Sequence, residues 1–140
     1  MAATMWRQLQ QLAANASRSR DSVKAAAGRE LGSYLRGIEE SERTVSIGFE
    51  ETDRYGGAFT MAANGGNASI HIDPTRISGR HGVGNQLILV HELGHAAVAV
   101  GGRGSAGSRA AFTESERIEN VYRSMFKCRR RADHYSVPRC

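Results

Sequence analysis

The sequence predicts an α+β protein in which a small mixed sheet packs on an apolar helix that is followed by a polar helix. Two stretches, 44–50 and 68–73, alternate apolar and polar residues, which is typical of short strands. The stretch 84–99 is strongly apolar and long enough for a buried helix. After a loop rich in glycine at 101–108, a last helix is expected from Ala110 to about Arg130.

The N-terminal part of the chain is predicted to be helical. Residues 2–17 are rich in Ala, Gln and Leu, which favour helix. A second helix can be capped by Asp21 or Ser22. Its apolar residues recur every three or four positions, so that one face packs: Val23, Ala27, Leu31, Tyr34, Leu35 and Ile38. We therefore separate an N-terminal helical segment, 1–42, with a role in delivery or packing, from a main domain, 43–140.

The segments between the strands and at the last helix carry turn and capping signals. Residues 52–67 contain several glycines and are interpreted as loop or a ragged hairpin. Pro74 stops the second strand. In the last helix, Thr113 can serve as the N-cap, with Glu116 three residues on in a capping-box relation.

Charge, hydropathy and cysteine content limit the classes of function. The 140 residues suit one domain, and the formal charge of +5 suits an acidic partner as well as a merely solvated basic end. Basic residues gather near the C-terminus at Lys127, Arg129, Arg130 and Arg131. No apolar run approaches the roughly 20 residues of a membrane span. The N-terminus lacks the pattern of a cleavable signal peptide, which predicts a cytoplasmic protein or a signal-independent route of secretion. Cys128 and Cys140 can pair or stay free.

The run His91-Glu92-Leu93-Gly94-His95 carries the strongest chemical signal. Histidines four apart on a helix differ by about 40° around its axis, so both rings can bind one Zn²⁺ at about 2.0–2.1 Å. Glu92 fits a general base that takes a proton from an activated water and passes it to the leaving amine. The competing interpretation is two core histidines bonded to backbone, with Glu92 at the surface.

A catalytic zinc ion needs a third protein ligand and an open position. The pattern with three histidines requires glycine at position 98 and histidine at 101, and is excluded by Val98 and Gly101. A carboxylate from the last helix is the better candidate, and Glu114, Glu116 and Glu119 lie there. Glu114 and Glu119 are about 140° apart around the helix, so at most one faces the metal.

A histidine pair in this motif, followed some twenty residues later by a glutamate on a second helix, resembles the gluzincin metallopeptidases. The ending Glu119-Asn120-x-x-Arg123 resembles small secreted metallopeptidases of bacteria, which are type III or type VI effectors and tips of polymorphic toxins. The resemblance covers about residues 68–125. It implies a zincin-like domain over 43–140, one Zn²⁺ per chain held by His91, His95 and a glutamate, and Glu92 as the base.

Among the glutamates, Glu114 is favoured as the third ligand because its separation from His95 in the sequence matches that of the gluzincins, and Glu119 is the rival. If Glu119 is the ligand, its neighbours Asn120 and Arg123 would lie around the metal ligands and orient them. Donors for the oxyanion of the transition state are sought among Tyr122, Arg123, His134 and Tyr135. The strand 68–73 is either the edge that pairs with an extended substrate or an ordinary strand of the sheet.

We therefore expect a zinc-dependent endopeptidase, secreted without a signal peptide into a target cell, where it cleaves a protein. A cognate immunity protein or a secretion chaperone is an expected partner. The alternative is a basic module that binds nucleic acid or an acidic partner, with a structural zinc site or none. It is less favoured because no aromatic residues are interleaved with the arginines after Lys127.

Overall fold

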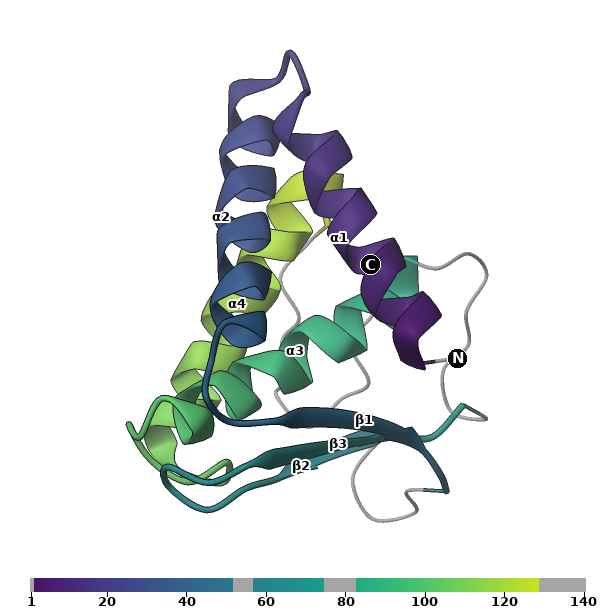
Figure 1. Ribbon diagram of the computed structural model, residues 1–140. Coiled ribbons are helices and arrows are strands. Elements are labelled where there is room, and N and C mark those ends of the chain that lie inside the picture. The colour runs from purple at the N-terminus through teal and green to yellow at the C-terminus, as the bar shows by residue number, and fades with distance from the viewer. Residues whose placement is uncertain (1, 52–56, 75–82, 129–140) are drawn as a thin grey trace.

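The computed structural model describes residues 2–51, 57–74 and 83–128 (Figure 1). This part of the chain forms four helices and one small mixed sheet, which confirms the predicted α+β class. Its elements, in chain order, are α1 (Ala2–Ser17), α2 (Ser22–Glu39), β1 (Val45–Phe49), β2 (Ala58–Met61), β3 (Ala68–Ile72), α3 (Val83–Val100) and α4 (Arg109–Phe126).

The sheet has the strand order β1-β3-β2. Strand β3 pairs in parallel with β1, where Ile47 faces Ile70, and antiparallel with β2, where Thr60 faces Ile70. Both edges of β3 are therefore occupied, so of the two interpretations of the 68–73 strand the ordinary strand of the sheet is confirmed and the edge for a substrate is wrong. Among the described strands the two edges of the sheet are β1 and β2, and β2 lies in the segment 52–67 interpreted from sequence as loop or a ragged hairpin.

Helix α3 lies along one face of the sheet, with α1, α2 and α4 beyond it (Figure 1). The alternating residues of β3 that face this helix, Ala68, Ile70 and Ile72, are buried. On α3 nearly every residue from Gln86 to Ala99 is buried, as expected of a helix that is apolar all round. The motif helix therefore runs through the centre of the molecule.

The two N-terminal helices belong to the same hydrophobic core as the motif helix. Leu9 of α1 and Leu31 of α2 are fully buried in one cluster with Leu93 of α3 and Ile118 of α4. Helices α1 and α2 approach closely at Gly28, where an added Cβ would lie 2.5 Å from the backbone nitrogen of Ser17. The segment 1–42 thus packs against the elements of the main domain.

The ends of α2 and α4 show which capping signals are used. Asp21 caps α2 by accepting from two backbone N–H groups, as one of the two expected caps. Helix α4 begins at Arg109, and Ser108 is its N-cap. The predicted cap at Thr113 is wrong because the chain is already helical four residues earlier. The helix ends at Phe126, with Lys127 left-handed at φ 55°, so the expected end near Arg130 is too late.

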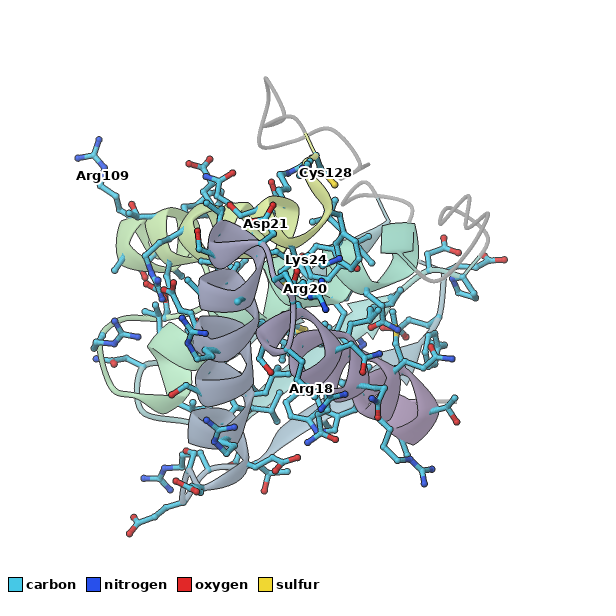
Figure 2. All side chains as sticks on the ribbon, turned by 90° about the horizontal axis from the view of Figure 1, so that it is seen from above. Arg18, Arg20, Asp21, Lys24, Arg109 and Cys128 are labelled. Atoms are coloured by element: carbon cyan, nitrogen blue, oxygen red, sulfur yellow. The ribbon has the colours of Figure 1, made fainter. Side chains whose placement is uncertain are left out.

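The C-terminal end of α4 lies beside the turn between α1 and α2. Lys127 Nζ is 3.8 Å from Asp21 Oδ2, and Figure 2 shows Asp21, Lys24 and Cys128 in this region. Cys128 is in a disulfide. The sequence leaves open whether Cys128 pairs with Cys140, and Cys140 lies outside the described residues. The arginines at 129–131 lie outside them as well. Among the described helices, none has the length and apolar character needed to cross a membrane.

Candidate functional site

Helix α3 brings the three charged or polar residues of the motif into the interior. His91, Glu92 and His95 are 5 %, 6 % and 7 % exposed. The imidazole rings of His91 and His95 have centroids 5.2 Å apart. Of the competing interpretation, the surface position of Glu92 is wrong because this carboxylate is buried, whereas both histidines lie in the core as it expects.

The ring of His95 is oriented by a main-chain carbonyl. Its Nδ1 lies 2.6 Å from the oxygen of Ala106, in the loop between α3 and α4. A carbonyl only accepts hydrogen bonds, so Nδ1 carries the hydrogen and a neutral ring presents its lone pair at Nε2. The N–H of Ala106 in turn donates to the oxygen of Ala62 at 3.0 Å, which ties the loop to the end of β2. Phe112 packs edge-on against the same ring, with centroids 5.1 Å apart.

The ring of His91 is oriented by a buried carboxylate. Its Nδ1 lies 3.1 Å from Oε1 of Glu119 on α4, and Nε of Arg123 donates to Oε2 of the same carboxylate at 3.2 Å. Glu119 and Arg123 are both 2 % exposed. The carboxylate is an acceptor, so His91 also carries its hydrogen on Nδ1 and, when neutral, its lone pair on Nε2.

The two histidines thus have the donor chemistry that zinc requires. Metal-binding histidines usually donate from the second ring nitrogen to a carboxylate or a backbone carbonyl, which fixes the ring and leaves the first nitrogen for the metal. His91 has the first arrangement and His95 the second. Among the residues that the structure describes, no cluster of three or more His, Cys, Asp or Glu side chains is assembled.

Glu92 is held from the sheet. The hydroxyl oxygen of Thr60 on β2 lies 2.9 Å from Oε2 of Glu92 and 3.2 Å from its main-chain oxygen. The hydroxyl hydrogen can therefore be donated to the carboxylate. This contact joins the motif helix to the edge strand at the residue expected to move a proton.

Glu114, the favoured third ligand from sequence, is bound to another partner. Its carboxylate accepts from Nε and Nη2 of Arg117 at 3.1 and 2.7 Å, and Nη1 of Arg117 reaches Glu30 on α2 at 2.6 Å. The hydrogen bonds from Arg117 lower the pKa of the Glu114 carboxyl against the opposing effect of burial. Burial and the neighbouring Glu114 raise the pKa of Tyr34 on α2 far above its usual range. The structure therefore joins Glu119, and not Glu114, to a motif histidine.

The other residues expected near the transition state lie in different surroundings. Tyr122 is fully buried in the hydrophobic core, and burial raises the pKa of its hydroxyl. Arg123 binds Glu119, and the main-chain oxygen of Asn120 accepts from Ser124 at 2.9 Å. His134 and Tyr135 lie outside the described residues.

Two residues of the site were missed by the sequence interpretation, Thr60 and Ala106. Thr60 lies in a segment whose glycines hide the short strand β2, and only its β-branched side chain hints at a strand. Ala106 acts through its carbonyl, which leaves no trace in its side chain.

A hollow of about 710 Å³ lies elsewhere, between α1, the end of α2 and β1. Its lining includes Trp6, Ile38 and Val45, and no residue of the histidine site. Glu39 is held there by Trp6 at 2.6 Å and by Gln10 at 2.7 Å. The site on α3 is therefore defined by its chemistry and not by this hollow.

Comparisons with protein-family models, with curated proteins and with solved structures found no match. The resemblance to gluzincin effectors therefore stays a prediction made from the motif residues.

Proposed function

We propose that this chain is a zinc-dependent endopeptidase that uses His91 and His95 as metal ligands and Glu92 as the general base. One observation carries the proposal: each motif histidine donates from Nδ1, one to Glu119 and one to the carbonyl of Ala106. Both rings are thereby suited to bind a metal through Nε2. Zinc held there would supply Lewis-acid chemistry that acidifies water and polarises the scissile carbonyl.

Glu92 is the proton carrier of the proposed reaction. Its carboxylate takes a proton from the attacking water and delivers it to the leaving amine, so it ends the cycle unchanged. The hydrogen bond from Thr60 restrains the carboxylate between these two steps. Burial of the side chain keeps competing water away from it.

The position of β2 supports a peptide as the substrate. An extended peptide can add to the edge of a sheet through main-chain hydrogen bonds. A peptide added to β2 would lie beside Thr60 and hence beside Glu92. Met61, the last residue of β2, is 61 % exposed and offers an apolar contact at this edge.

Metal content and peptidase activity test the proposal directly. Zinc-loaded wild type is compared with Glu92→Gln and His95→Ala on a mixed peptide library read by mass spectrometry. Glu92→Gln is expected to keep its zinc and to lose activity by roughly 10²–10⁴-fold, since a general base is removed. His95→Ala is expected to lose both. If the wild-type protein binds no zinc under metal-replete conditions, the proposal is wrong.

The setting we propose is that of a secreted bacterial effector or toxin that acts on a protein of a target cell. The proposal is supported by the Glu119-Asn120-x-x-Arg123 ending together with the motif. Expression of wild type inside candidate target cells is expected to impair growth, whereas Glu92→Gln is not. Equal impairment by both would point to the alternative, a module that acts by binding.

A further inference from the structure

Helix α4 meets both motif histidines through one of its faces. Phe112 packs against His95, and Glu119 binds His91. The contacts run in reverse order along the two helices, so the start of α4 lies beside His95 and its later part beside His91. The helices cross between these contacts, where an added Cβ on Gly94 would lie 2.4 Å from Cα of Ser115. The part of α4 beside both rings is therefore the stretch between Phe112 and Glu119.

Glu116 is the glutamate that this face carries between the two contacts. At 3.6 residues per turn, Glu116 is rotated about 40° from Phe112 and about 60° from Glu119. Glu114 is rotated about 160° from Phe112, towards the side where it binds Arg117. Glu116 is exposed whereas Glu119 is buried, so its carboxylate lies on the open side of this face.

The expected capping role of Glu116 does not apply. Helix α4 begins at Arg109 with Ser108 as its N-cap, and the residue three positions after this cap is Ala111. Glu116 thus lies in the interior of the helix, where an N-terminal backbone N–H is out of its reach. Glu114 is turned towards Arg117, and Glu119 binds His91 on Nδ1, the ring nitrogen opposite the proposed metal-binding Nε2.

We propose that Glu116 is the third zinc ligand, joining Nε2 of His91 and Nε2 of His95. This inference rests on the proposed function and names the carboxylate that completes its metal site. The side chain has three rotatable bonds and an exposed position, so a change of rotamer can redirect its carboxylate. Three protein ligands leave the fourth position of a tetrahedral zinc ion open for water.

The test is the zinc affinity of the full chain, measured by competition between the apoprotein and a chromophoric chelator with zinc as the probe. Glu116→Gln is expected to weaken zinc binding more than Glu119→Gln, for which loss of a histidine's partner predicts roughly 10–100-fold. Glu114→Gln is the matched control and is expected to bind zinc as wild type does. Glu116→His supplies another zinc ligand and is expected to bind more tightly than Glu116→Gln.

The visible spectrum of the cobalt-substituted protein gives a second readout that does not depend on activity. Loss of a ligand in Glu116→Gln is expected to change the ligand-field bands, which Glu114→Gln leaves as they are. Zinc affinity in Glu116→Gln equal to wild type, or a loss confined to Glu114→Gln, would overturn the inference and leave the proposed function standing. A wild type without zinc would overturn both.

Discussion

Helix α4 carries two glutamate–arginine pairs on opposite sides, and they are held very differently. The side chains of Glu119 and Arg123 are 2 % and 3 % exposed, and Glu119 also binds His91. Those of Glu114 and Arg117 are 13 % and 46 % exposed, and Arg117 also binds Glu30 on α2. The buried pair faces the candidate metal site, and the outer pair clamps two helices together.

A glutamate–arginine pair therefore contributes differently to stability depending on whether it is buried or exposed to water. An outer pair gains little from its charges because water competes with each partner. A buried pair is expensive to desolvate, and removing one partner leaves the other charge stranded. Retaining such a pair is easier to understand where it has a task, and here the task is to orient His91.

The largest effect is expected from breaking the buried pair. Glu119→Ala removes the carboxylate that binds both Nε of the buried Arg123 and Nδ1 of His91. We expect the free energy of unfolding of the apoprotein to fall by about 3–5 kcal/mol. Urea denaturation of the two proteins measures it. A loss below about 1 kcal/mol would mean that the two pairs are energetically alike.

The next effect concerns the crossing that separates the two sides of α4. A Cβ on Gly94 would lie 2.4 Å from Cα of Ser115, so Gly94→Ala forces α3 and α4 apart. We expect a loss of about 1–3 kcal/mol in unfolding free energy. Gly37→Ala on α2 is the matched control, since nothing lies within 4 Å of its added Cβ, and is expected to gain up to about 1 kcal/mol. Equal changes in both variants would contradict the close approach.

Breaking the outer pair is expected to have a small effect. Arg117→Ala removes the partner of Glu114 and Glu30 at a position that is half exposed. We expect the charges to contribute about 0–1 kcal/mol to the free energy of unfolding, with some packing lost over the ring of Tyr34. Zinc affinity should stay at the wild-type level. A loss of zinc in this variant would assign the outer side of α4 to the metal site.

The smallest effect is the pH dependence of the outer pair. The pKa of Glu114 is lowered in the folded protein from its ordinary 4.5, chiefly by hydrogen bonds from Arg117. A lowered folded pKa stabilises the fold at pH values above 4.5, and this contribution disappears as the pH falls through the folded pKa. The gap in unfolding free energy between wild type and Glu114→Gln should therefore shrink between pH 7 and pH 3. A gap that widens towards low pH would contradict this sign.

Much of the fold follows from the sequence because local patterns carry it. The alternation at 44–50 and 68–73 predicts the outer strand β1 and the central strand β3, and the apolar run around His91 predicts the buried helix. The other outer strand, β2, lies in the segment interpreted as loop or a ragged hairpin. Which strand is central does not follow, because pairing partners far apart in sequence decide it. Ser108 and Thr113 are both good caps, and only the packing of α4 decides between them.

The candidate site, like the fold, can be predicted from the sequence only in part. The motif spacing predicts that the rings of His91 and His95 lie together, and they do. Which glutamate faces them depends on the rotation of α4, which is set by its packing against α2 on one side and α3 on the other. Sequence distance from His95 alone favoured Glu114, whose partner Arg117 belongs to the contact with α2.

The two motif histidines differ in how easily a mutation can remove the hydrogen-bond partner that orients the ring. The partner of His91 is the side chain of Glu119, which a single codon change can remove. The partner of His95 is the backbone of residue 106, which every amino acid possesses. Proline alone would interfere, because the N–H of Ala106 is needed to hold the loop against Ala62. Point mutations can therefore disturb the orientation of the His91 ring far more easily than that of the His95 ring.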